Sequence, residues 1–258
     1  MNYPIKFSKD HLKVEIYETP SLMALRAAAF VTDHIARIIS SKDFARIVIA
    51  TGASQFSFYE ELIKCDIDWK KVNVFHLDEY LGIHENHPAS FRKYLKERIL
   101  DIVKPADIHL LNGDSPDAEK EAATYAALLK DGGTDLACIG IGENGHIAFN
   151  DPPVADFNDE KLVKLVELDA ACRKQQFGEG WFKSLDEVPT HAITLTIPAI
   201  MGASIISCVV PDQRKAEAVK NTLEGSIAES TPATVLRRHP DATLFLDSDS
   251  ASLLSLEK

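Results

Sequence analysis

Short apolar runs alternate along the chain with longer amphipathic segments, and the spacing of the apolar positions predicts secondary structure. Continuous apolar runs bounded by turn residues predict buried strands, and apolar positions that recur every three or four residues predict helices. The predicted extended segments are residues 14–17, 45–50, 72–77, 108–111, 136–141, 162–168, 192–197, 204–210 and 242–246. The predicted helices are residues 19–40, 57–62, 90–103, 117–130 and 212–223, with a short helix from Pro198.

Strands and helices alternate almost throughout, and the strands are continuously apolar. Both features predict an α/β fold with one doubly wound, mostly parallel sheet that has helices on both faces, as in Rossmann-like proteins. No linker, internal repeat or change of composition divides residues 1–258. We therefore expect a single α/β domain.

Composition limits the classes of partner. The formal net charge is −11, which argues against a general affinity for nucleic acid or for an anionic membrane surface. The four cysteines (Cys65, Cys138, Cys172 and Cys208) are far apart and predict neither a disulfide framework nor a zinc site. Residues 1–10 contain no apolar signal core, and no stretch approaches the ~20 apolar residues of a membrane span. We therefore expect a cytoplasmic protein.

Three polar turns follow predicted strands, at residues 51–54, 78–80 and 142–151. Ligands of open parallel sheets bind at the carboxyl ends of the strands. Because all three turns should reach the same edge of the sheet, we expect them to form one site.

The first turn contains Thr51, Gly52, Ala53 and Ser54 and joins a strand to a helix. Its small residues let a ligand approach the backbone, and free N–H groups at a helix start suit a phosphate. It is neither a Walker loop nor a dinucleotide fingerprint. The alternative is an ordinary turn in which Ser54 caps the helix. Lys215 follows another strand and is a candidate phosphate ligand, or else a solvated lysine.

The other two turns carry candidate acid/base groups. Asp78 and Glu79 are adjacent, and neighbours on an extended chain point in opposite directions, so we expect only one to enter the site as a general base. The alternative is a capping or surface acid. His146 lies between two residues that could orient its ring, Asn144 and Asp151. The alternative is a loop histidine with local hydrogen bonds.

Together, these residues resemble the glucosamine-6-phosphate deaminase family, which shares its fold with 6-phosphogluconolactonases. The segments that carry the resemblance are residues 75–82, 87–91, 111–113, 140–150, 188–194 and 238–240. The sequence Gly-His-Ile-Ala-Phe-Asn at residues 145–150 resembles the deaminase branch. The lactonases usually carry a segment of the Gly-His-Thr-Ala-Ser type at this place.

The resemblance implies a role for each group. Asp78 would be the base that moves a proton between C1 and C2 of the open-chain sugar. His146, supported by Asn144 and Asp151, would assist opening of the pyranose ring. The turn at residues 51–54 and Lys215 would hold the 6-phosphate. The reaction would convert glucosamine 6-phosphate and water into fructose 6-phosphate and ammonia, with no metal or organic cofactor.

The chain departs from the family pattern at three places. The phosphate turn of the family usually reads Thr-Gly-Gly/Ser-Thr-Pro, and here it is Thr-Gly-Ala-Ser-Gln at residues 51–55. The family usually has Glu at the position of Asp151, and the shorter Asp leaves open whether the contact with His146 is direct, bridged by water or absent. The family's phosphate-binding arginine would fall near Gly178, where this chain has none, so Arg173 or Lys174 is a candidate substitute. These departures keep two alternatives open: a sugar-phosphate lactonase or isomerase, and a sugar-phosphate sensor without turnover.

The expected small-molecule partner is a phosphorylated hexosamine. The sequence does not distinguish its epimers and is compatible with a homo-oligomer.

Overall fold

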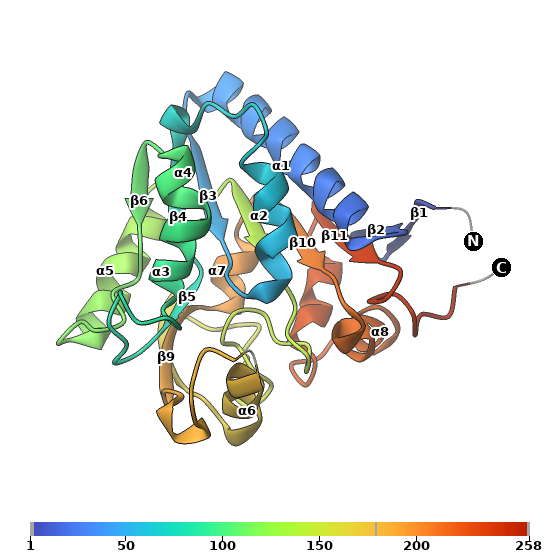
Figure 1. Cartoon of the computed structure of the whole chain (residues 1–258). Helices are drawn as coiled ribbons and strands as arrows, with labels where there is room; N and C mark the ends of the chain where they lie inside the picture. Colours follow the sequence, from blue (N-terminus) through green and yellow to red (C-terminus); the bar gives the residue numbers. More distant parts are fainter. Residues whose placement is uncertain (1–2, 179, 257–258) are drawn as a thin grey trace.

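A large, mostly parallel sheet runs through the middle of the computed structural model, which describes residues 3–178 and 180–256 (Figure 1). Within these residues the sheet has eight strands in the order β1-β2-β11-β10-β7-β3-β4-β6, and its pairings are parallel except that of β1 with β2. The strands are β1 (Ile5–Lys9), β2 (Leu12–Tyr17), β3 (Ala45–Ile49), β4 (Val72–His76), β6 (Asp107–His109), β7 (Leu136–Ile139), β10 (Ile205–Val210) and β11 (Ala242–Asp247).

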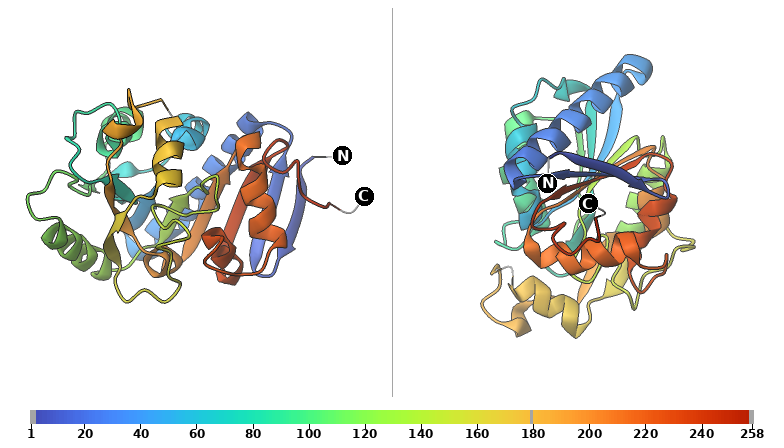
Figure 2. Two further views of the ribbon diagram at one scale, coloured as in Figure 1. Left: turned by 90° about the horizontal axis from the view of Figure 1, so that it is seen from below. Right: turned by 90° about the vertical axis from the view of Figure 1, so that its right-hand side faces the viewer.

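Helices cover both faces of this sheet (Figure 1, Figure 2). They are α1 (Pro20–Lys42), α2 (Phe56–Leu62), α3 (Phe91–Leu95), α4 (Asp101–Val103), α5 (Ala118–Lys130), α7 (Ile197–Met201) and α8 (Ala216–Glu224), whereas α6 (Ala170–Gly178) packs elsewhere. Side chains of α1, α2 and α3 belong to one buried cluster, and those of α5, α7 and α8 belong to another.

The central strand β3 shows why its sequence is continuously apolar. Ile47 and Ile49 belong to the cluster under α1, whereas Val48 between them belongs to the cluster on the opposite face. Successive side chains of a strand point to opposite faces, so both faces are buried and both need apolar residues. The predicted fold class, a doubly wound and mostly parallel α/β sheet, is confirmed.

A second, smaller sheet was not predicted. It consists of β5 (Asp78–Tyr80), β9 (His191–Leu195) and β8 (Val163–Glu167), which pair antiparallel in the order β5-β9-β8. The chain passes from the large sheet to the small one at Leu77, whose N–H bonds to Ile49 O in β3 while its carbonyl accepts from Leu195 N in β9. Helix α6, also not predicted, packs on the small sheet through Cys172, which lies in a buried cluster with Tyr80 and Phe149.

The segment predicted as one helix over residues 90–103 is built from three pieces, because a π-helical turn at Lys96–Leu100 separates α3 from α4. Ser90 occupies the N-cap position of α3, but its hydroxyl donates to Glu79 Oε2 at 2.8 Å and makes no cap hydrogen bond to its own helix. Glu79 takes over the capping role, since it accepts from the backbone N–H groups of Phe91 and Arg92.

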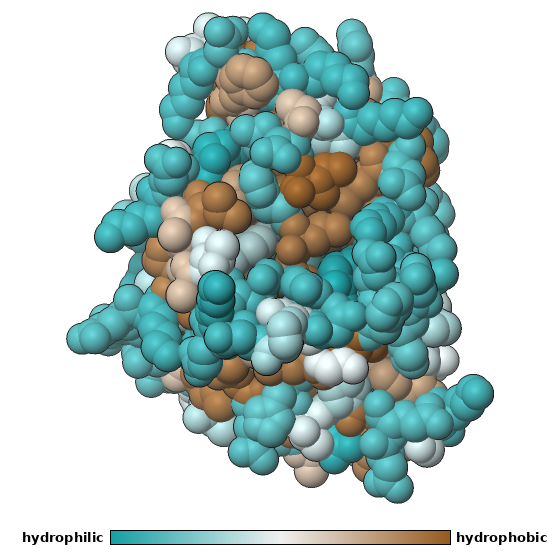
Figure 3. Space-filling model, turned by 90° about the vertical axis from the view of Figure 1, so that its left-hand side faces the viewer, coloured by the Kyte–Doolittle hydropathy of each residue, from teal (hydrophilic) through white to brown (hydrophobic). Residues whose placement is uncertain are grey.

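The two ends of the described chain lie beside each other at the β1 edge of the large sheet (Figure 1, Figure 2). Seen from the side of α5 and β6, the surface is mainly hydrophilic and carries separate hydrophobic patches (Figure 3). Among the helices in the part of the chain described by the structure, none is long and apolar enough to span a bilayer.

Candidate active site

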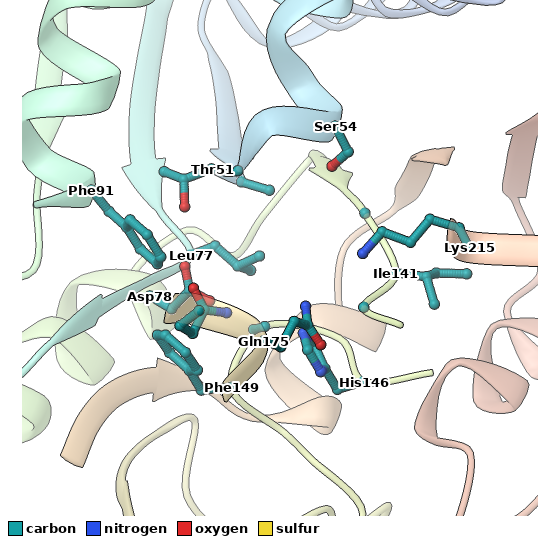
Figure 4. A pocket seen from close by; sticks show the side chains of 16 residues that line it. Thr51, Ser54, Leu77, Asp78, Phe91, Ile141, His146, Phe149, Gln175 and Lys215 are labelled. Carbon is teal, nitrogen blue, oxygen red and sulfur yellow. The ribbon is translucent and has the colours of Figure 1, made fainter. Parts of the chain in front are cut away.

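The three polar turns meet in one pocket where β3, β4 and β7 end (Figure 4). The space between the lining atoms is about 560 Å³, including the part open to solvent, which is within the usual size of small-molecule sites. The lining residues are Ala50, Thr51, Gly52, Ser54, Leu77, Asp78, Phe91, Gly140, Ile141, Gly142, His146, Ala148, Phe149, Gln175, Gln176 and Lys215.

The two adjacent carboxylates point in opposite directions, as expected from an extended backbone. Asp78 lines the pocket and is 6% exposed. Glu79 is fully buried at the start of α3 and is not among the lining residues. Burial raises the pKa of Glu79, and its hydrogen bonds from Ser90, Phe91 and Arg92 offset only part of that effect. Asp78 is therefore the carboxylate that a ligand can reach.

A buried network fixes the segment that carries Asp78. The Arg92 guanidinium contacts Glu79 Oε2 at 3.3 Å and donates to Asn112 Oδ1 at 2.6 Å and to Asp114 Oδ1 at 2.9 Å. Because Glu79 directly follows Asp78, this network ties the pocket carboxylate to α3 and to the turn after β6. None of these positioning contacts was predicted from the sequence, because they join residues far apart in the chain.

A tight turn places His146. Gly142 N–H donates to His146 O at 2.9 Å, and Gly145 N–H donates to Gly142 O at 3.0 Å. Gly145 has a φ of +85°, a backbone conformation that glycine adopts without strain. At Gly142 a Cβ would lie 2.1 Å from His146 Cε1, so the imidazole occupies the space that any other residue would fill. Both glycines are therefore required for this position of the ring.

The imidazole is held by a three-residue hydrogen-bonded cluster. His146 Nδ1 lies 2.9 Å from Asp151 Oδ1 and 2.7 Å from Asn144 Oδ1, and Asn144 Nδ2 donates to Asp151 Oδ1 at 2.8 Å. The question left open by the short Asp151 side chain is thus answered by a direct contact. Burial alone would raise the pKa of Asp151, but the bonds from His146, Asn144 and the Cys172 thiol outweigh it and lower the pKa.

Because these contacts engage Nδ1, the other ring nitrogen, Nε2, is the one available to a ligand. His146 is only 8% exposed. The cluster holds the ring in one orientation and places a carboxylate beside Nδ1. Asn144 and Asp151 do not line the pocket themselves and lie behind the histidine.

The predicted phosphate turn lies across the pocket from His146. Thr51, Gly52 and Ser54 line the pocket, whereas Ala53 borders a neighbouring surface cavity instead. Gly52 has a φ of +106°. Lys215 is 8% exposed and its side chain points toward the centre of the pocket (Figure 4), so it is not a solvated surface lysine.

The structure does not bring Arg173 to the pocket. Its guanidinium donates to Leu185 O at 2.8 Å and to Val188 O at 2.9 Å, and it is not a lining residue. Neither is Lys174. Helix α6 presents Gln175 and Gln176 to the pocket instead. Neither glutamine was predicted to line the site, because α6 was not predicted from the sequence.

The pocket therefore combines one ammonium group with hydroxyls, amides, one carboxylate and one imidazole among its described lining residues. This set suits a polar anionic ligand and proton transfer. Within the described ranges, no group of three or more His, Cys, Asp or Glu side chains is placed to hold a metal ion.

Comparison with known proteins gives a consistent result. Residues 18–245 match the family described as glucosamine-6-phosphate isomerases/6-phosphogluconolactonase. A glucosamine-6-phosphate deaminase of an Exiguobacterium species is 38% identical over 216 residues, which cover 84% of this chain and 83% of that protein. A glucosamine-6-phosphate deaminase of Listeria monocytogenes is 37% identical over 216 residues, which cover 84% of this chain and 90% of that protein.

Solved structures agree with the fold. The structure of a monomeric glucosamine-6-phosphate deaminase superposes with a TM-score of 0.86 at 32% identity, covering 93% of this chain and 99% of the other. A 6-phosphogluconolactonase from Shewanella baltica superposes with a TM-score of 0.76 at 19% identity, covering 95% and 99%. The lactonase likeness shows a shared fold alone.

Proposed function

The chain belongs to the family of glucosamine-6-phosphate isomerases and 6-phosphogluconolactonases, and from this membership we propose that it is a glucosamine-6-phosphate deaminase. It converts glucosamine 6-phosphate and water into fructose 6-phosphate and ammonia. The observation that carries the proposal is one pocket in which Asp78 and His146 lie together with Ser54 and Lys215. Relatives between 35% and 38% identical carry this name.

His146 opens the sugar ring. In this step a base takes the proton of the C1 hydroxyl while a proton is delivered to the ring oxygen, and the C1–O5 bond breaks. The Nε2 atom of His146 can take and deliver these protons, because Asp151 and Asn144 engage the other ring nitrogen, Nδ1. Asp151 stabilises the transient imidazolium, since a carboxylate beside a protonated ring lowers its free energy.

Asp78 then transfers a proton from C2 to C1 of the open-chain sugar. Removal of the C2 proton, with a proton added to the aldehyde oxygen, gives an enolamine, and return of the C2 proton to C1 turns it into a C2 iminium ion. Addition of water to the C=N bond then releases ammonium and leaves the ketose. The carboxylate is nearly buried, which suits a base that must hold a proton briefly.

The phosphate binds between the turn of residues 51–54 and Lys215. The small residues of the turn permit close approach to backbone N–H groups, and the Lys215 ammonium supplies the opposite charge. Arg173 has no part in this proposal, because its guanidinium is held by backbone carbonyls elsewhere. Gln175 and Gln176 offer neutral amides on the α6 side of the pocket.

Ammonia release is the direct test. The purified chain is assayed with glucosamine, galactosamine and mannosamine 6-phosphates, and unphosphorylated glucosamine serves as the control. We expect release from glucosamine 6-phosphate and at least about a 10³-fold lower kcat for Asp78→Asn, because the amide cannot accept the C2 proton. Absence of ammonia from all three epimers overturns the proposal. Hydrolysis of 6-phosphogluconolactone without ammonia release indicates a lactonase, and binding without turnover indicates a sensor.

We also propose that the enzyme works in the cytoplasm, in line with the charge and the expected sugar-phosphate substrate. Whether it acts as a monomer or a homo-oligomer is decided by light scattering on the purified chain.

A further inference from the structure

Gln55 lies beneath the phosphate turn and is fully buried. Its Nε2 atom donates to Ser54 Oγ and to Val209 O in β10, both at 3.2 Å. The backbone closes the turn around it, because Gln55 N–H donates to Gly52 O at 3.0 Å. A Cβ at Gly140 would lie 2.9 Å from Nε2, so a side chain there would displace the amide.

These contacts determine which way the Gln55 amide faces. A backbone carbonyl only accepts hydrogen bonds, so the NH₂ group and not the oxygen must face Val209 O. The second N–H of the same group then donates to Ser54 Oγ.

The direction of the amide sets the direction of the Ser54 hydroxyl. A hydroxyl that accepts from Gln55 must send its own proton elsewhere, and among the described residues Ser54 Oγ has no acceptor. Ser54 lines the pocket on the same side as Lys215. We propose that Gln55 is a positioning residue that orients the Ser54 hydroxyl as a hydrogen-bond donor toward the substrate phosphate. This inference rests on the proposed binding of a sugar phosphate by the turn.

The unpaired side-chain oxygen of Gln55 indicates that this residue is not there to stabilise the fold. Gln55 Oε1 is buried and has no hydrogen-bond partner among the described residues. A buried carbonyl without a partner destabilises the folded state. An apolar residue of similar volume would avoid that cost, so we expect Gln55→Met to fold and to lose phosphate affinity.

A double-mutant cycle tests the proposal with the full chain. Ser54→Ala, Gln55→Met and the double variant are compared with the parent in KM and kcat for glucosamine 6-phosphate, and in the Kd of inorganic phosphate by calorimetry. We expect Ser54→Ala to raise KM and Kd about 10- to 100-fold and Gln55→Met about 3- to 10-fold, because a bond to an anion is stronger than the neutral bond that orients it. A change confined to binding leaves kcat within about twofold.

Coupling separates a positioning role from a structural one. If Gln55 acts through Ser54, the double variant binds phosphate no more weakly than Ser54→Ala alone, because the oriented hydroxyl is already absent. Additive losses, or an unchanged KM and Kd in Gln55→Met, overturn the inference. If Gln55→Met does not fold, Gln55→Leu takes its place, since its apolar side chain cannot donate to Ser54.

Calorimetry keeps the two proposals distinguishable. A chain that releases no ammonia but binds phosphate in a manner coupled to Gln55 and Ser54 disproves the deaminase function and supports the inference. A chain that releases ammonia with a Gln55→Met variant of unchanged KM and Kd disproves the inference alone. A parent chain that binds no phosphate overturns the inference, and the deaminase function is then decided by ammonia release alone.

Discussion

Adding one methyl group at Gly142 should inactivate the enzyme without changing any charged group. The new Cβ would lie 2.1 Å from His146 Cε1 and 2.4 Å from Nδ1, where ordinary contacts begin at 3.4 Å. The imidazole must therefore retreat by about 1.3 Å, which breaks the 2.9 Å contact between Nδ1 and Asp151 Oδ1. A displacement of about 1 Å of a catalytic group costs roughly 100-fold in rate.

We expect Gly142→Ala to lower kcat for ammonia release by about 10²- to 10³-fold and the free energy of unfolding by about 1–3 kcal/mol. The KM should change much less, because the phosphate turn and Lys215 do not touch the added methyl. Steady-state ammonia release and urea denaturation measure the two effects separately.

Gly178→Ala is the matched control. A Cβ at Gly178 meets no atom of the described residues within 4 Å, so this substitution adds the same methyl group without a clash among them. It should leave both kcat and stability close to those of the parent. If Gly142→Ala keeps kcat within about threefold of Gly178→Ala, the observed orientation of His146 is not needed for catalysis and the reasoning is refuted.

Three further variants test the buried charges. Asp151→Asn should lower kcat at least about 10-fold, since the amide cannot stabilise protonated His146. The pKa of Asp151 is lowered below 3.8 in the folded state, so its stabilising effect is present above that pH and is lost as the pH falls through the folded pKa. In urea denaturation, the difference in free energy of unfolding between the parent and Asp151→Asn should therefore shrink below pH 3.8. A difference that stays constant would contradict this. Lys215→Met should raise KM about 10- to 100-fold with little change in kcat, and an unchanged KM would exclude it as the phosphate cation. Glu79→Ala should reduce the free energy of unfolding by about 3–5 kcal/mol, because it removes one of the two carboxylates paired with buried Arg92 and the acceptor of the Phe91 and Arg92 N–H groups; a loss below about 1 kcal/mol in urea denaturation would show that the network relaxes.

Much of the fold could be predicted from the chain because its local signals agree. The strand at residues 45–50 is apolar on both faces, and Thr19 before Pro20 marks the start of α1, where its side chain accepts from Leu22 N. The small sheet could not be predicted in this way. The strand β5 is three residues long and follows β4 after a single residue, so it reads as the end of that strand.

Some residues of the site could likewise be predicted from the sequence, and others could not. His146 was indicated by its place in a turn between Asn144 and Asp151, and Asp78 by its place after a strand. Gln175 and Gln176 were not indicated, since they reach the pocket only because α6 packs on the small sheet through Cys172. The position of Gln55 could not be predicted from the sequence either, because its hydrogen-bond partner Val209 lies 154 residues away.

The sequence by itself determined the α/β class, the three turns at the strand ends and the resemblance to the deaminases, because each depends on residue types within a few positions of one another. Only the tertiary structure decided that Asp151 reaches His146, that Arg173 faces away from the pocket, and that Gln55 lies beneath Ser54. The physical reason is that a side chain's direction and hydrogen-bond partner are set by elements packed against it from distant parts of the chain. Periodicity within a segment carries no information about those neighbours.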